Sequence, residues 1–324
     1  MSKIKQTKAL IEPEMRKFEV FFKNTVKSKV PLLDVVMNYI IRRKGKQMRP
    51  MFVFLTAKLF GEPTNSTYVA ATLIELMHTA TLVHDDVVDD ADKRRGFFSI
   101  NALWKSKIAV LTGDFLLSKG LLLAVENKEF ELLEIVSEAV KEMAEGELLQ
   151  IEKSRKLDIT EETYFKIIYK KTATLIASCM AAGAKSSQAS DQDMLKLKEF
   201  GKYAGIAFQI KDDLFDYQKT NLTGKPSGND IQEKKITLPL IYALNNTSRS
   251  EKNRILKIIQ KHNTNKAKVS EVISFVKENG GLKYTEQKMQ EYKDKASNIL
   301  SAFPDSAPKN ALTDMLEYVI RRKK

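Results

Sequence analysis

The sequence is poor in residues that break helices and in residues that cross-link chains. It has 13 glycines and 8 prolines among 324 residues, whereas these two types together usually make up roughly 12% of a protein. Few breakers mean few turns, so the elements between the turns should be long. The single cysteine, Cys179, excludes an internal disulfide and a zinc site built on cysteines. We expect Cys179 to pack in the core.

The chain also lacks long apolar runs. No stretch approaches the roughly 18 consecutive apolar residues of a transmembrane helix, and the N-terminal segment has no apolar core of a secretory signal. We therefore expect a cytoplasmic protein without a transmembrane segment. The net charge of +13 suits a soluble surface or an anionic partner. Because basic residues form no long run and do not alternate with aromatic residues, we expect no nucleic-acid partner.

Apolar residues recur at helical spacing along most of the chain, and no segment alternates like a strand. Residues 93–99 are predicted as a basic loop, and residues 221–230 as the longest loop. No linker or shift in composition divides the chain, so we predict one all-α domain over residues 1–324. The predicted helices are 3–29, 32–43, 51–60, 67–90, 106–125, 128–154, 160–185, 190–218, 236–245, 250–262, 267–279, 281–303 and 308–322.

Two predicted helices end in the same pattern of carboxylates. The residues are Asp85, Asp86 and Asp89 in helix 67–90, and Asp212, Asp213 and Asp216 in helix 190–218. In each cluster the first and third side chains lie one turn apart on one face. Such close like charges repel and oppose the helix dipole, so a cation would stabilise them, and oxygen ligands favour Mg²⁺. One cluster alone could be a solvated helix end, but two with identical spacing favour a metal site.

Basic residues accompany these clusters at positions beside glycines or around the long loop. They are Lys46 and Arg49 in segment 45–50, Arg94 and Arg95 before Gly96, and Lys225 and Lys235 around the long loop. Arginine and lysine bind phosphate oxygens directly. A single one of them would be read as a surface charge. Their occurrence together with two metal-type clusters predicts a diphosphate bound through Mg²⁺.

These ordered motifs resemble those of the trans-polyprenyl diphosphate synthases, also called isoprenyl diphosphate synthases, and in particular the medium- and long-chain type. Residues 75–96 resemble the first aspartate-rich motif of that family, and residues 205–216 resemble the second. Further matches follow in family order at 45–50, 113–116, 146–150, 171–173, 224–230 and 235–239. The resemblance is dense over residues 40–240. It implies the isoprenoid synthase fold, a bundle of long helices around a central cavity.

The resemblance also implies a reaction, in which an allylic prenyl diphosphate condenses head-to-tail with isopentenyl diphosphate. About three Mg²⁺ ions would be held by the six aspartates named above. Family positions that assist the departing diphosphate correspond to Arg94, Lys171, Gln209, Lys225 and Lys235. Those that hold isopentenyl diphosphate correspond to Lys46, Arg49, His78 and Arg95. Thr172 and Gln209 would steady the carbocation. The resemblance further implies a homodimer, and a long apolar product suggests a transient membrane contact on release.

The resemblance also implies that the length of the product depends on residues just before the first cluster, where short-chain relatives often carry an aromatic residue. Ala80 and Thr81, about one helical turn before Asp85, are both small. A growing chain could pass them, so we predict a product beyond geranylgeranyl, such as hexaprenyl to decaprenyl. A short-chain farnesyl or geranylgeranyl synthase is the alternative. A non-catalytic regulatory subunit is less favoured because all six aspartates are present. A terpene cyclase would not need the residues assigned to isopentenyl diphosphate. Without the resemblance, His78 reads as a core-facing polar residue.

Overall fold

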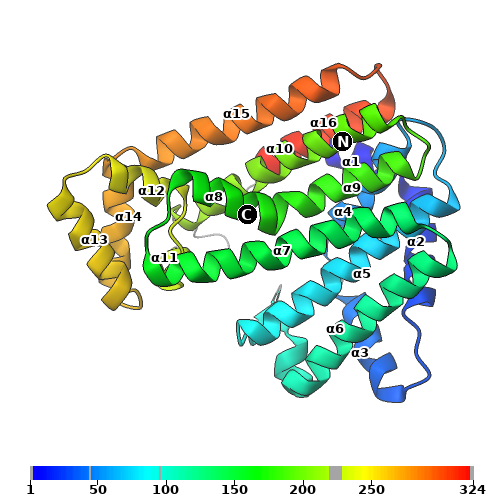
Figure 1. Cartoon of the computed structure of the whole chain (residues 1–324), viewed down its shortest axis with the longest axis horizontal. Coiled ribbons are helices and arrows are strands. Elements are labelled where there is room, and N and C mark those ends of the chain that lie inside the picture. The colour runs from blue at the N-terminus through cyan, green and yellow to red at the C-terminus, as the bar shows by residue number, and fades with distance from the viewer. Residues whose placement is uncertain (1–2, 44, 95, 219–227, 322–324) are drawn as a thin grey trace. The chain divides into compact units, whose positions relative to one another are not determined.

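The computed structural model describes residues 3–43, 45–94, 96–218 and 228–321, and most of them are helical (Figure 1). The strands β1 (Lys93–Arg94) and β2 (Phe97–Phe98) form a short antiparallel hairpin. The prediction of an all-α fold is confirmed. The helices are α1 (Lys3–Leu10), α2 (Glu12–Thr25), α3 (Pro31–Arg42), α4 (Met48–Ala57), α5 (Asn65–Val88), α6 (Ile100–Glu126), α7 (Phe130–Lys156), α8 (Glu161–Ile168), the π-helix η1 (Tyr169–Ala173), α9 (Thr174–Lys185), α10 (Asp191–Asp216), α11 (Asn229–Gln232), α12 (Leu238–Asn245), α13 (Arg249–Lys261), α14 (Lys266–Glu278), α15 (Gly281–Ser301) and α16 (Ala307–Arg321).

Three segments differ from the predicted helices. The predicted helix 3–29 is two helices, because the chain turns at Ile11 and Pro13 then occupies the first turn of α2. Helix α6 has a short first segment before the predicted residue 106, which the Ser99 hydroxyl caps by accepting the Ala102 N–H at 2.9 Å. A kink at Lys105, with φ of 69° and ψ of 163°, separates this segment from the predicted helix. The predicted helix 160–185 is interrupted by η1. The predicted basic loop 93–99 contains the β1–β2 hairpin, whose two-residue strands are too short to give an alternating pattern.

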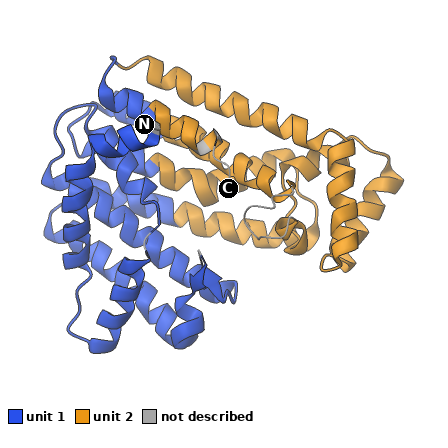
Figure 2. Ribbon diagram, turned by 180° about the vertical axis from the view of Figure 1, so that it is seen from behind, with its two compact units in different colours: residues 1–140, 178–198, 304–312 blue, residues 141–177, 199–303, 313–324 orange. Residues whose placement is uncertain are grey.

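The described contacts divide the chain into two compact units (Figure 2). Unit 1 comprises residues 1–140, 178–198 and 304–312. Its core is built around α5, which packs against α6, α4 and α2, with Phe18, Phe54 and Leu73 fully buried. Cys179 is also fully buried, and burial raises the pKa of its thiol to about 12. The single domain over residues 1–324 stays a prediction.

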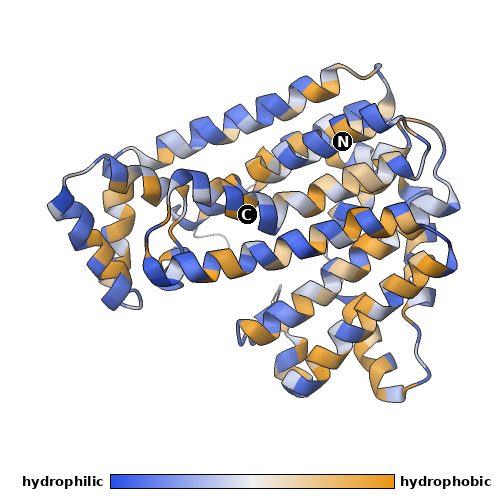
Figure 3. Cartoon of the chain, in the orientation of Figure 1, coloured by the Kyte–Doolittle hydropathy of each residue, from blue (hydrophilic) through white to orange (hydrophobic). Residues whose placement is uncertain are grey.

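Helix α6 is largely hydrophobic (Figure 3), and part of its apolar surface is exposed in the single chain. By length and composition it could span a membrane, although 39% of the relevant window is buried. Core helices of globular proteins have the same properties, so this is weak evidence for a membrane span. The exposed apolar side chains of α6 are Leu103, Val110, Leu111, Leu121, Leu122 and Val125.

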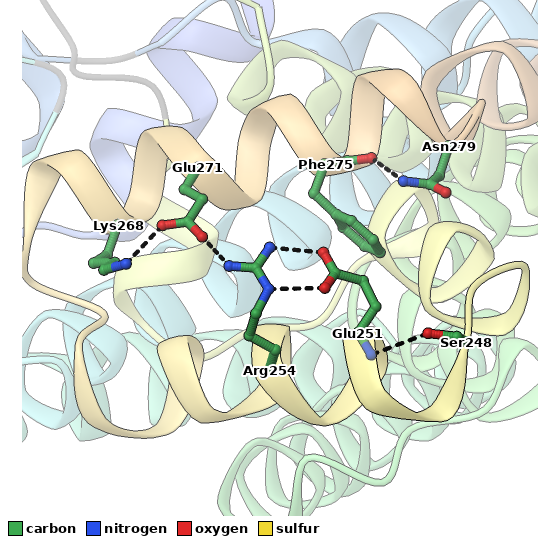
Figure 4. A network of polar contacts seen from close by, with 7 residues as sticks. All are labelled: Ser248, Glu251, Arg254, Lys268, Glu271, Phe275 and Asn279. Atoms are coloured by element: carbon green, nitrogen blue, oxygen red, sulfur yellow. Dashed lines mark hydrogen bonds and ion pairs between the residues drawn. The ribbon is translucent and has the colours of Figure 1, made fainter.

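Unit 2 comprises residues 141–177, 199–303 and 313–324. Within it, α12 packs against α8, α14 and α15, and α13 packs against α14. Arg254 of α13 pairs with Glu251 of its own helix and with Glu271 of α14, and Glu271 also accepts from Lys268 at 2.8 Å (Figure 4). The network is partly exposed, and exposed ion pairs stabilise little. The α13–α14 pair is therefore held mainly by its buried apolar residues.

Candidate active site

The first aspartate cluster occupies the C-terminal turn of α5. The helix ends where Asp89 becomes its C-cap, with the Asp89 N–H donating to the Asp85 carbonyl at 2.8 Å. Asp86 is buried, with 4% of its surface exposed. Its carboxylate accepts a hydrogen bond of 2.6 Å from Nε of Arg94. Burial raises the pKa of the Asp86 carboxyl, and the charge of Asp89 raises it further. The hydrogen bond and the charge of Arg94 lower it, but the net shift is upward.

The β1–β2 hairpin delivers Arg94 to this cluster. Gly96 adopts a positive φ of 81° at the turn, a backbone conformation that glycine tolerates best. The Ser99 N–H donates to the Asp92 carbonyl at 2.9 Å and closes the hairpin. Arg94, predicted to bind a diphosphate, thus has a carboxylate partner in the cluster itself. This ion pair orients Asp86 before any ligand binds.

Unit 1 contains a cavity of about 360 Å³ beside this cluster. Three predicted site residues line it, namely His78, Asp86 and Arg94. Gly45 and Gln47, which flank Lys46 in sequence, line it as well. Further lining residues come from α2, α3 and the hairpin, and sequence reasoning did not identify them as site residues. They include Arg16, Lys23, Tyr39, Arg43, Phe97 and Phe98.

The second aspartate cluster occupies the C-terminal turn of α10 in unit 2. Asp213 is buried, with 5% of its surface exposed. Its two carboxylate oxygens accept hydrogen bonds from the Tyr164 hydroxyl at 2.7 Å and from the Gln209 amide at 2.8 Å. Burial raises the pKa of Asp213 to about 7, even though both hydrogen bonds lower it. Repulsion from Asp212 and Asp216 adds to the upward shift.

Asp216 has a different set of contacts. Its carboxylate accepts the backbone N–H groups of Asn229 and Asp230, each at 3.0 Å, at the start of α11. The Gly228 N–H donates to the Asp216 carbonyl at 2.9 Å. Asp216 therefore anchors the chain where it returns after residues 219–227. The sequence predicted only a metal-binding role for Asp216. Its contacts with residues 229 and 230 could not be predicted, because no pattern in the sequence connects these positions.

Asp230 completes the acidic group in unit 2. Burial raises the pKa of its carboxyl to about 8, and the charges of Asp213 and Asp216 raise it further. The sequence signal for Asp230 was present, since it lies in a segment that matches the family pattern, but it was not selected as a site residue. Tyr164 gave no sequence signal of its own, because its partner Asp213 lies 49 residues away.

The π-helix η1 places two predicted residues beside the second cluster. The Thr172 hydroxyl donates to Oε1 of Gln209 at 2.8 Å, which extends the polar chain from Thr172 through Gln209 to Asp213. Lys171 forms an ion pair with Glu147. Gly205 lets α10 approach η1 closely, because a Cβ at this position would lie 2.5 Å from the Cα of Ala173.

Most predicted residues of unit 2 line a second cavity of about 130 Å³. Lys235 is among them. Burial lowers the pKa of Lys235, but the hydrogen bond to Glu233 and the charges of Glu233, Asp230 and Glu147 together raise it above its usual value. The other predicted site residues that line this cavity are Lys171, Thr172, Gln209 and Asp213. Tyr164, Gln150 and Asp230 also line it and were not predicted as site residues. Two predicted residues, Arg95 and Lys225, lie outside the described residues.

The donor chemistry of both clusters fits magnesium. Each consists of carboxylates, the hard oxygen ligands that Mg²⁺ prefers. Burial is the main cause of the raised pKa values of Asp213 and Asp230, and repulsion between neighbouring aspartates adds to it. A divalent cation would relieve this repulsion. Within the described parts of the chain, no three His, Cys, Asp or Glu side chains are already gathered around one cation position. The ligands would have to adjust when the ion binds.

Comparison with known proteins agrees with this geometry. The family model for "Polyprenyl synthetase" matches residues 30–276. Octaprenyl diphosphate synthase of Escherichia coli is 36% identical over 91% of both chains. The crystal structure of a decaprenyl diphosphate synthase from Rhodobacter capsulatus is similar with a TM-score of 0.93 and 31% identity, over 98% of each chain. A geranylgeranyl pyrophosphate synthase from Bacteroides thetaiotaomicron has a TM-score of 0.84 and 39% identity, over 99% of each chain.

These similarities extend over nearly the whole chain. They confirm the resemblance inferred from the aspartate motifs, and they confirm the isoprenoid synthase type of all-α fold. The chain belongs to the polyprenyl synthetase family.

Proposed function

We propose that this protein is a Mg²⁺-dependent trans-prenyltransferase that condenses an allylic prenyl diphosphate with isopentenyl diphosphate. The observation that carries the proposal is the pair of matching carboxylate clusters, each at the end of a long helix and each with a buried aspartate oriented by a neighbouring side chain. Arg94 orients Asp86, and Tyr164 orients Asp213. Membership of the polyprenyl synthetase family supports the reaction class.

The six aspartates Asp85, Asp86, Asp89, Asp212, Asp213 and Asp216 would hold the Mg²⁺ ions. When bound, Mg²⁺ stabilises the negative charge that develops on the departing diphosphate. Lys171 and Lys235 line the same cavity as Asp213, where their ammonium groups can bind phosphate oxygens after giving up their present partners Glu147 and Glu233.

The carbon chemistry needs few protein groups. Departure of the diphosphate leaves an allylic carbocation, and the double bond of isopentenyl diphosphate attacks it to form the new C–C bond. The resulting cation then loses a proton to the departed diphosphate. The hydroxyl oxygen of Thr172 keeps lone pairs while its hydrogen is donated to Gln209. These lone pairs can stabilise the nearby positive charge. His78, 7% exposed on the cavity of unit 1, would bind isopentenyl diphosphate together with Lys46 and Arg49.

We propose a product longer than geranylgeranyl. Ala80 is buried, and Thr81 keeps its hydroxyl in its own helix by donating to the His78 carbonyl at 2.9 Å. Neither side chain is bulky enough to block a growing chain. The relatives named as octaprenyl and decaprenyl diphosphate synthases support this length. The relative named as a geranylgeranyl synthase, at 39% identity, favours the short-chain alternative.

We also propose a homodimer. The exposed Val110, Leu111, Leu121, Leu122 and Val125 of α6 recur at helical spacing on the surface of the single chain. A second copy that covered this stripe would remove apolar area from water. The cytoplasmic location, the absence of a nucleic-acid partner and a transient membrane contact for product release stay predictions.

The decisive experiment is a product analysis. The purified protein is given farnesyl diphosphate, isopentenyl diphosphate and Mg²⁺, and the dephosphorylated products are separated by chromatography. We expect all-trans chains longer than geranylgeranyl from the wild type and none from Asp85→Ala. Asp191→Ala, which removes an exposed carboxylate at the opposite end of α10, is the matched control and should stay active. Products that stop at farnesyl or geranylgeranyl would contradict the proposed length, and activity in Asp85→Ala would contradict the mechanism.

A further inference from the structure

The guanidinium of Arg43 lies close to two aromatic rings at the cavity of unit 1. Arg43 follows the last residue of α3. Its guanidinium carbon lies 4.0 Å from the ring centroid of Tyr39 and 4.2 Å from that of Phe97. Both are close cation–π distances. The arginine therefore joins the end of α3 to the β1–β2 hairpin.

One of the two rings near Arg43, that of Tyr39, is itself held in place. The Tyr39 hydroxyl donates to the carbonyl of Phe98 at 2.6 Å, and the Tyr39 ring meets Trp104 edge-on at 5.2 Å. An arginine in contact with such a ring loses little further freedom when it binds an anion. The ring contacts therefore prepare the guanidinium for a ligand.

Contact with the rings engages none of the five N–H donors of the guanidinium with an oxygen acceptor, so these donors remain for a ligand. Among the described residues, no carboxylate forms an ion pair with Arg43. Its neighbour Arg94 differs, because it is paired with Asp86 at 2.6 Å. Arg43 lines the same cavity as His78, Gly45 and Gln47. The cavity thus contains a cation that forms no ion pair with a described acid, although Glu19 and Glu75 also line it.

We propose that Arg43 is a further diphosphate-binding residue of this protein, and that its guanidinium edge binds phosphate oxygens of isopentenyl diphosphate. This inference rests on the proposed function for the identity of the ligand. The chemistry of binding does not depend on the proposed function, since a planar fork of donors at a cavity wall suits any diphosphate. If Arg43 only held the hairpin through its ring contacts, replacing it would not change the affinity for the ligand.

The test compares Arg43→Met with Arg42→Ala. Methionine keeps an apolar stem beside the rings and removes the charge, so the ring contacts should survive better than in Arg43→Ala. Arg42 is exposed at the last position of α3 and does not line the cavity, so its variant loses one positive charge in the same segment. Arg43→Lys keeps the charge without the planar fork and should fall between Arg43→Met and the wild type.

In steady-state kinetics we expect Arg43→Met to raise the KM for isopentenyl diphosphate by about tenfold, the size of one charged hydrogen bond. The KM for the allylic substrate and kcat should change less than twofold. Arg42→Ala should resemble the wild type. Equal KM values in the Arg43→Met and Arg42→Ala variants, or an equal rise for both substrates, would overturn the inference.

Calorimetry with inorganic pyrophosphate and with isopentenyl diphosphate, both in excess chelator, separates this inference from the proposed function. Without Mg²⁺ the aspartate clusters repel diphosphate, so the titration reports the basic residues. Loss of affinity in Arg43→Met but not in Arg42→Ala supports the inference even if no elongated product is found. Unchanged affinity in an enzyme that does elongate prenyl chains refutes the inference and leaves the proposed function intact.

Discussion

The hydroxyl of Tyr164 on α8 donates a hydrogen bond of 2.7 Å to Oδ2 of Asp213 on α10. Both side chains are buried. Burial raises the pKa of Tyr164 well above its usual value, and the charge of Asp213 raises it further, so the tyrosine stays a donor. Gln209 holds the other oxygen of Asp213. A carboxylate proposed to bind metal is thus positioned by two neutral donors rather than by a cation.

We predict that Tyr164→Phe weakens metal-dependent activity. Removal of the hydroxyl leaves a buried oxygen of Asp213 with one donor fewer and frees the carboxylate to rotate. Loss of an outer partner of a metal ligand typically costs about 10- to 100-fold in metal affinity or activity. The half-saturating Mg²⁺ concentration for turnover should rise by about that factor. Tyr203→Phe is the matched control, since its hydroxyl donates to Glu199 at a part-exposed site. Identical Mg²⁺ curves for both variants would refute the positioning role.

We predict that Thr81→Phe shortens the product. Thr81 is part-exposed and lies about one helical turn before Asp85, so a phenylalanine there should block the growing chain without disrupting the core. Chromatography of the products should show a shift toward farnesyl and geranylgeranyl lengths, while the rate of the first condensation is kept. Leu195→Phe, at an exposed position of α10, should leave the distribution unchanged. An unaltered distribution in Thr81→Phe would place the growing chain elsewhere.

We predict that Gly113→Ala destabilises the protein through His84. A Cβ at residue 113 would lie 2.1 Å from Nε2 of His84, so the imidazole, which lies 3.2 Å from the Val110 carbonyl, would have to move. Such overpacking typically lowers the free energy of unfolding by about 1–3 kcal/mol. Denaturant unfolding measures the change. In the double variant His84→Ala with Gly113→Ala the clash disappears. The loss of unfolding free energy in the double variant should therefore be smaller than the sum of the losses in the two single variants. Full additivity would show that the clash is relieved in another way.

We predict that Mg²⁺ and inorganic pyrophosphate together raise the thermal midpoint of unfolding, because ligands that bind only the native state stabilise it. Mg²⁺ removal by a chelator should abolish both this shift and turnover. Asp213→Asn should reduce the shift, since it removes a proposed ligand charge. Asp191→Asn, at an exposed position, should keep the full shift. Equal shifts in the two variants would argue against a metal at the second cluster.

Much of this protein could be predicted from its sequence. Scarce glycine and proline and the helical spacing of apolar residues predicted long helices, and these are local properties of the chain. The two aspartate clusters were also readable, because residues one turn apart on a helix share a face whatever the rest of the fold does. The spacing therefore grouped Asp85 with Asp89, and Asp212 with Asp216, before any tertiary contact was known.

The partners of these aspartates were decided only by the tertiary structure. The Tyr164 hydroxyl reaches Asp213 from another helix. The ring contacts of Arg43 join the end of α3 to the β1–β2 hairpin, although α4 and α5 lie between them in the sequence. Periodicity cannot anticipate such contacts, because they depend on how helices pack rather than on spacing within a helix. The π-helix η1 was not predicted either, although its Ala173 lies close to Gly205 of α10. Local spacing thus determined which groups carry the charge, and packing decided which side chains orient them.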